Sequence, residues 1–221
     1  MQEVFDFNAK MLNILLQQTI SDKITFSQIT NWHKSHPYLR LNYYDGIQMS
    51  QCLGIYVGLN PDFLSTFQNI IEIGTYNGGL TSWVFDNSNA KLISYDIDGT
   101  INHTNKTDID FRVDDCFNEK PFNDIVELIR SEGRTLVLCD GGDKPKEFNT
   151  FSKYLKSGDV IMAHDYCESE EEWKEKTDYW QWPYEADTYP HSIESGIKEN
   201  NLEPYKYEEM KFLLWASYIK K

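Results

Sequence analysis

Residues 69–98 decide the fold, and they read NIIEIGTYNGGLTSWVFDNSNAKLISYDID. The run at 69–73 predicts a short buried strand, and the run at 91–95 predicts a second one. Between them, Gly74 suits a tight turn, and residues 78–85 predict a helix. A strand, a helix and a second strand in so short a stretch predict two parallel strands joined by a right-handed crossover.

The same alternation continues toward the C-terminus. Further strands are predicted at 111–113, 134–139 and 160–163, and helices at 123–130, 147–155 and 193–198. Two last strand candidates, 203–208 and 212–219, are separated by too few residues for a parallel crossover, so we expect them to pair antiparallel. The predicted fold class is therefore α/β: a doubly wound, Rossmann-like, mostly parallel seven-stranded sheet with an antiparallel C-terminal strand.

Two segments stand apart from this alternation. Residues 1–68 carry apolar side chains at helical spacing between Met11 and Ile20, which predicts a helical N-terminal cap before a sheet domain at 69–221. Residues 166–190 combine many Trp and Tyr with several Glu. We expect this segment to form a lid over a substrate, and the alternative is that its aromatic rings pack against the N-terminal helices.

Composition narrows the choice of partners and compartment. The 221 residues include 21 Lys and Arg against 35 Asp and Glu, a net charge of −14, which disfavours nucleic acid and anionic membranes as partners. No apolar run reaches the roughly 18 residues of a membrane span, and the acidic N-terminus lacks a signal-peptide pattern. Scattered cysteines predict neither a zinc site nor disulfides, and favour a cytoplasmic location: Cys52, Cys116, Cys139 and Cys167.

Ligands of such sheets bind at the carboxyl ends of the strands, where the first turn here reads Gly74-Thr75-Tyr76-Asn77-Gly78. Tyr76 stands where a dinucleotide-binding turn has its second glycine, which argues against a nicotinamide-dependent oxidoreductase. Asp96 follows the second strand, 22 residues beyond Gly74, where a carboxylate can accept both hydroxyls of a ribose.

Acidic residues also follow the later strands. Asp114 and Asp115 come after the third strand and suit either an adenine amino group or the start of a helix. Asp140 follows the fourth strand, and His164 and Asp165 follow the fifth. Because neighbouring strands lie about 4.8 Å apart, these three side chains can converge on one divalent cation. The alternative is a turn cap at Asp140 and a buried, hydrogen-bonded His164.

These motifs resemble class I S-adenosylmethionine (SAM)-dependent methyltransferases. More narrowly, GIQMSQ, IIEIGTYNGGLTSWVF, ISYDID, LVLCDGG and LKSGDVIMAHDY resemble the macrocin-type O-methyltransferases and cephalosporin-hydroxylase-like proteins, over residues 45–166. The resemblance implies O-methylation of a hydroxylated small molecule, with a sugar or glycan unit favoured, assisted by Mg²⁺ or Mn²⁺. A metal-independent methyltransferase with His164 as general base stays open, as do a non-catalytic binding protein and the oligomeric state.

The resemblance also assigns roles to residues. It implies that Glu72, Gly74 and Gly78 hold the methionine part of SAM, Asp96 the ribose and Asp115 the adenine. The full set expected at the cofactor is Glu72, Gly74, Thr75, Tyr76, Gly78, Asp96, Ile97, Asp114, Asp115 and Asp140. The expected metal ligands are Asp140, His164 and Asp165, with His164 standing where the family has an acid. The candidate catalytic residues are His164, Asp143 and Lys144.

Overall fold

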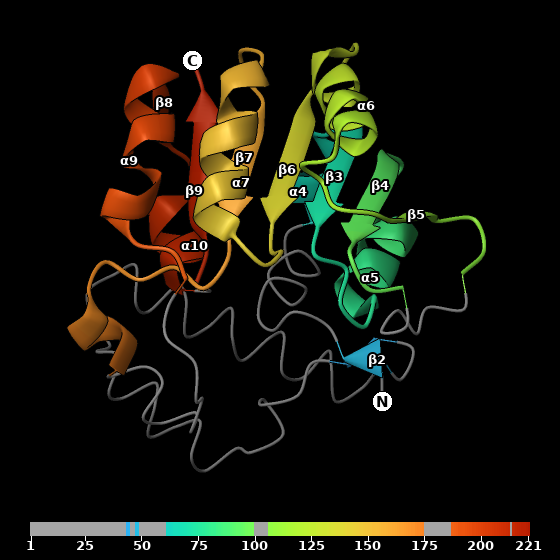
Figure 1. Ribbon diagram of the computed structural model, residues 1–221, viewed down its shortest axis with the longest axis horizontal. Coiled ribbons are helices and arrows are strands. Elements are labelled where there is room, and N and C mark those ends of the chain that lie inside the picture. The colour runs from blue at the N-terminus through green and yellow to red at the C-terminus, as the bar shows by residue number, and fades with distance from the viewer. Residues whose placement is uncertain (1–42, 45–46, 49–60, 100–105, 175–186, 213) are drawn as a thin grey trace.

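The computed structural model describes residues 43–44, 47–48, 61–99, 106–174, 187–212 and 214–221 (Figure 1). Most of the predicted cap at 1–68 and the middle of the predicted lid at 166–190 lie outside these residues. Two short strands, β1 (Tyr43–Tyr44) and β2 (Ile47–Gln48), pair antiparallel within residues 1–68. Among the described residues, none of the helices has the length and apolarity to span a membrane.

One seven-stranded sheet organises the chain, in the order β5-β4-β3-β6-β7-β9-β8. The first five strands of this sheet along the chain are mutually parallel, and β9 runs antiparallel to both β7 and β8. The predicted fold class is therefore confirmed. The strands are β3 (Asn69–Ile73), β4 (Lys91–Asp96), β5 (Asp110–Val113), β6 (Thr135–Cys139), β7 (Val160–Ala163), β8 (Leu202–Pro204) and β9 (Ala216–Lys220).

Helices cover both faces of this sheet. In Figure 1, α6 (Glu119–Arg130), α7 (Lys144–Phe151) and α9 (Pro190–Glu199) lie in front, and α4 (Pro61–Ser65), α5 (Gly79–Asn87) and α10 (Tyr207–Phe212) lie behind. A short 3₁₀ turn, η2 (Ser152–Tyr154), continues α7. The doubly wound arrangement follows from the sequence, because an α/β sheet must bury both of its faces.

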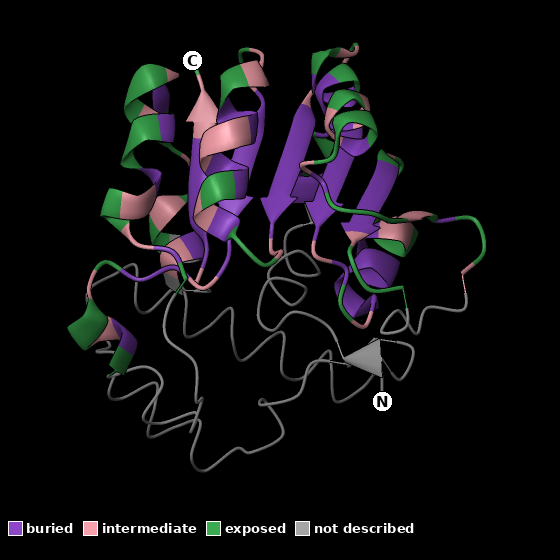
Figure 2. Cartoon of the chain, in the orientation of Figure 1, coloured by how far each residue is buried: buried purple, intermediate pink, exposed green. Residues whose placement is uncertain are grey.

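The core consists of two apolar clusters, one on each face of the sheet. Neighbouring residues of one strand point to opposite faces, so Ile70 and Leu136 join the cluster with α4 and α5, and Ile71 and Val137 join the cluster with α6 and α7. Figure 2 shows that the central strands are buried along their length. The central strands therefore hold their carboxyl ends in fixed positions at one edge of the sheet.

The tail of the chain differs from its prediction. The strand predicted at 203–208 stops at Pro204, because Lys206 has a φ of +49° that breaks the extended backbone, and α10 follows it. The strand predicted at 212–219 begins only at Ala216. Met210 and Trp215 are buried in the same cluster, so packing stabilises a short helix where the residue pattern indicated a strand.

The described cysteines are buried free thiols, as expected. Cys116, Cys139 and Cys167 form no disulfide, and Cys52 lies outside the described residues. Burial raises the pKa of the Cys116 thiol to about 12, so that thiol stays protonated and unreactive at neutral pH. The cytoplasmic location stays a prediction.

The turn after β3 requires glycine at one position. Gly74 has a φ of +92°, and a Cβ there would lie 2.1 Å from the carbonyl oxygen of Asp140. On either side of this contact, Gly74 donates its N–H to Tyr95 O and Asp140 donates its N–H to Ile73 O, each at 2.8 Å. The absence of a side chain therefore lets the ends of β3 and β6 approach one another.

We expect Gly74→Ala to lower the free energy of unfolding by at least about 3 kcal/mol. The new Cβ would force the Asp140 carbonyl to move, and alanine is also strained at a φ of +92°. Gly158→Ala is the matched control, since Gly158 has a φ of +89° with nothing within 4 Å of its Cβ position. That control should lose only the cost of the left-handed backbone, about 1–2 kcal/mol. Urea unfolding measures both, and equal losses would contradict the close approach.

Candidate functional site

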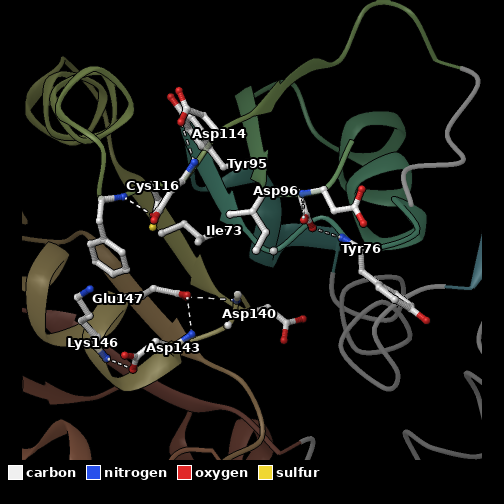
Figure 3. Close-up of a pocket in the computed structure, with 17 residues that line it drawn as sticks. Ile73, Tyr76, Tyr95, Asp96, Asp114, Cys116, Asp140, Asp143, Lys146 and Glu147 are labelled. Atoms are coloured by element: carbon white, nitrogen blue, oxygen red, sulfur yellow. Dashed lines mark hydrogen bonds between the residues drawn. The ribbon is translucent and has the colours of Figure 1, made fainter. Parts of the chain in front are cut away.

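A cavity of about 530 Å³ opens at the carboxyl ends of β3, β4, β5 and β6 (Figure 3). Several residues expected at the site line it: Gly74, Tyr76, Asp96, Ile97, Asp114, Asp115, Asp140 and Asp143. Others do not line it: Glu72, Thr75, Gly78, Lys144, His164 and Asp165. Sequence reasoning missed several lining residues, among them Cys116, Phe117, Lys146 and Glu147.

The carboxylate of Asp96 is held by two backbone amides. Tyr76 donates its N–H to Asp96 Oδ2 at 2.8 Å, and Asp98 donates its N–H to Asp96 Oδ1 at 3.0 Å. Tyr76 itself has a φ of +46°, and its exposed ring points away from the other labelled side chains (Figure 3). Because a carboxylate oxygen has a second lone pair, Asp96 can still accept two hydrogen bonds from a ligand.

Asp114 and Asp115 both shape the turn before α6 and line the cavity. Asp115 Oδ1 accepts the N–H of Phe117 at 2.9 Å, while Asp114 Oδ1 accepts the amide of Asn118 at 2.7 Å. The structure therefore shows the expected function at the start of a helix, and the contact with an adenine amino group stays a prediction. Phe117 adds an apolar wall, and its ring stacks on Phe151 at 6.2 Å.

Glu72 lies beneath the glycine turn and does not face the cavity. Its Oε2 accepts hydrogen bonds from the hydroxyls of Thr81 and Ser94, and Ser94 in turn contacts Thr75. Burial raises the pKa of Glu72 to about 7, although these hydroxyl donors favour the ionised form. Glu72 thus ties β3, β4 and α5 together, and Gly78 precedes α5 with a φ of +78°.

Glu147 has a similar position under the β6–α7 turn. Its carboxylate accepts the N–H of Gly141 at 3.2 Å and the N–H of Asp143 at 3.3 Å. Burial raises the pKa of Glu147 to about 7. The signal that could have identified this residue is an acid in the first turn of a helix, which was predicted to start only at 147. Asp143 caps that helix by accepting the N–H of Lys146.

Asp140, His164 and Asp165 converge beside the cavity, as the sequence predicts. Each offers a ligand atom, and these atoms lie within 4.8 Å of one another. His164 Nδ1 is 2.9 Å from Asp140 Oδ1 and 3.6 Å from Asp165 Oδ1. Burial alone would lower the pKa of His164, but the two carboxylates outweigh it and raise that pKa to about 9.

Lys144 approaches the same cluster from the start of α7. Its buried Nζ lies 3.3 Å from Asp165 Oδ2 and 2.7 Å from Asp187 Oδ2. Burial opposes the charge of Lys144, but the carboxylates of Asp165, Asp140 and Asp187 raise its pKa above the ordinary value. Lys144 is therefore an ammonium at neutral pH, which argues against its expected function as a proton acceptor.

The donor set of this cluster fits a divalent cation. Two carboxylates and an imidazole are ligands that Mn²⁺ and related ions accept, whereas Mg²⁺ prefers oxygen alone. Asp140 belongs both to the cavity and to the cluster, since it lines the cavity and its carboxylate contacts His164. A cation held here would lie next to a ligand in the cavity.

Comparison with known proteins finds a relative that matches part of the sequence, and solved structures that share the fold. No protein-family model matches the chain. Phosphoethanolamine N-methyltransferase of Triticum aestivum is 26% identical over 109 residues, which span 46% of this chain and only 21% of the wheat protein.

Two solved structures of CmcI have the same fold. One, titled as the apo form, aligns with a TM-score of 0.57 at 15% identity, over 81% of this chain and 76% of that chain. The other, titled as holding Mg and SAM, has a TM-score of 0.53 at 17% identity, over 75% and 69%. The two alignments confirm the fold that the resemblance implies.

The buried Glu72 predicts a pH dependence of stability. A carboxyl whose pKa is about 7 in the folded chain, against 4.5 ordinarily, stabilises the fold below pH 4.5 and loses that contribution as pH rises through 7. Relative to Glu72→Gln, the wild type should therefore lose roughly 3 kcal/mol of unfolding free energy between pH 4.5 and 8.

Urea unfolding of both proteins across this pH range checks the prediction. Glu147 titrates in both proteins, so its contribution cancels in the difference between their unfolding free energies. Glu194→Gln, on the exposed side of α9, controls for the loss of one negative charge. A difference between wild type and Glu72→Gln that does not change with pH would contradict an uncharged, buried Glu72.

Proposed function

We propose that this chain is a SAM-dependent methyltransferase that transfers the methyl group to a hydroxyl oxygen of a small molecule. The observation that carries the proposal is the arrangement of Asp96, Asp140 and the Asp140–His164–Asp165 cluster along one edge of the sheet. A fixed carboxylate for a ribose lies at one side of the cavity, and a cluster that can hold an acceptor hydroxyl lies at the other.

The cavity fits SAM in its size and in its donors and acceptors. A volume of about 530 Å³ suits a ligand of nucleoside size. Asp96 offers free lone pairs to the ribose hydroxyls, and Asp115 offers one to an adenine amino group. Gly142 lines the cavity with nothing within 4 Å of its Cβ position, which leaves room for the amino acid part of the ligand.

In the proposed reaction a bond forms between the acceptor oxygen and the methyl carbon while the bond from carbon to sulfur breaks. The hydroxyl proton is released to water, and S-adenosylhomocysteine (SAH) remains. Positioning supplies much of the rate in such a displacement, because both reactants must be held in line. Asp140 contacts both halves of the site and is therefore the residue that sets their relative position.

Asp140, His164 and Asp165 would hold a divalent cation, which supplies Lewis acidity that lowers the pKa of a bound hydroxyl. The imidazole of His164 is kept in place by its Nδ1 contact with Asp140. Its pKa of about 9 means that it carries a proton at neutral pH while no cation is bound to the carboxylates of Asp140 and Asp165. The alternative in which His164 is the sole base therefore requires that proton to be lost first.

The acceptor we favour is a hydroxylated small molecule such as a sugar or glycan unit. Vicinal hydroxyls can share one cation, and the Asp140–His164–Asp165 cluster lies beside the cavity. The net charge of −14 disfavours a polyanionic acceptor such as a nucleic acid.

Binding of SAH should stabilise the wild-type chain. At a hundredfold excess over Kd, the gain is about 2.7 kcal/mol, which raises Tm by roughly 5–10 °C. Asp96→Ala should lose at least about half of this shift, which corresponds to a tenfold loss of affinity. Asp108→Ala removes an exposed acid away from the cavity and should keep the whole shift. An unchanged shift in Asp96→Ala would remove the ribose assignment.

Asp140→Ala should lose methyl transfer at least about a hundredfold while SAH still raises Tm, because the cluster loses the residue that joins it to the cavity. The measurement is transfer of radioactive methyl from SAM to a panel of hydroxylated acceptors, with Mn²⁺ and with a chelator. Full activity of Asp140→Ala would refute the cluster's involvement. Absence of turnover in the wild type, despite SAH binding, would favour a non-catalytic binding protein.

A further inference from the structure

Lys144 places a positive charge inside the carboxylate cluster. It is the first residue of α7, and its side chain is buried, with the ammonium between Asp165 Oδ2 at 3.3 Å and Asp187 Oδ2 at 2.7 Å. A lysine is seldom buried unless it is paired with an acid. The mechanism proposed above gives this residue no function.

Asp187 is held beside the cluster by backbone pairing of its neighbour. Thr188 is buried, donates its N–H to Asp165 O at 3.3 Å and accepts the N–H of Cys167 at 3.1 Å. Tyr166 and Thr188 form a parallel β-bridge. Asp165 and Asp187 adjoin the two bridged residues, so backbone pairing holds both acidic partners of Lys144 near its ammonium.

A divalent cation and the Lys144 ammonium compete for one of these partners. Asp165 is both a candidate metal ligand and the weaker, longer partner of Lys144. Two positive charges on one carboxylate repel each other strongly in a site shielded from water. Asp187 offers the ammonium a second carboxylate that belongs to no metal-ligand cluster among the described residues.

We propose that Lys144 is a positioning residue that acts as an internal competitor of the metal: it neutralises Asp165 when the cluster lacks a cation, and Asp187 retains it when a cation binds. This inference rests on the proposed metal site. It predicts opposite effects for the two partners, since Lys144 weakens cation binding and Asp187 strengthens it.

The test is Mn²⁺ affinity of the whole chain, measured from the paramagnetic resonance signal of free Mn²⁺, with no SAM and no turnover needed. Lys144→Gln should bind Mn²⁺ at least about tenfold more tightly than the wild type. Asp187→Asn should bind it at least about tenfold more weakly, because the ammonium is left with Asp165 alone. Lys153→Gln, an exposed lysine of η2, controls for the change in net charge and should leave the affinity unchanged.

If Lys144→Gln binds Mn²⁺ no more tightly than the wild type, Lys144 does not compete with the cation for Asp165, and the inference is overturned. The proposed metal site is unaffected by that result. If Lys144→Gln does not fold, Asp187→Asn decides by itself, since an unchanged or tighter affinity overturns the inference. If no protein binds Mn²⁺, the inference fails together with the metal part of the proposed function. The rise in Tm with SAH then shows separately whether the cofactor part survives.

Discussion

The site depends on the close approach of two strand ends, the turn at Gly74 and the carbonyl of Asp140. The 2.1 Å between that oxygen and the position of a Cβ leaves room for hydrogen only. The backbone bonds beside it, from Gly74 to Tyr95 and from Asp140 to Ile73, join three neighbouring strands at their carboxyl ends. Asp96 ends β4 and Asp140 follows β6, so the fold determines the positions of these two residues before any ligand is present.

Two buried glutamates support the loops that surround the cavity. In their ionised form these two side chains destabilise the folded chain. Glu72 holds hydroxyls under the first turn, and Glu147 holds backbone amides under the turn after β6. Burial raises the pKa of each to about 7. A carboxylate in an apolar interior is destabilising, so their presence at two neighbouring turns indicates that loop geometry is favoured over maximal stability.

The sequence predicted the parts of this structure that depend on local pattern. The strand at 69–73 and the acids after the parallel strands could be located because apolar runs and strand-end rules are short-range. The helix at α10 was missed, because burial of Met210 and Trp215 comes from tertiary packing. Glu147 was missed because its helix was predicted to start only at 147, although it begins at Lys144. The Lys144–Asp187 pair was missed because its two residues lie 43 positions apart in the chain, which no local spacing encodes.

The proposed function requires the carboxyl ends of β3, β4, β5 and β6 to form a cofactor site for SAM. Calorimetric titration of the wild-type chain with SAH, with and without Mn²⁺ and beside NADH as the competing nucleotide, tests it most directly. We expect SAH to bind at micromolar concentrations and NADH to give no heat, since Tyr76 stands where a pyrophosphate needs a bare backbone. Heat from NADH, or none from SAH, would contradict it and leave only the fold.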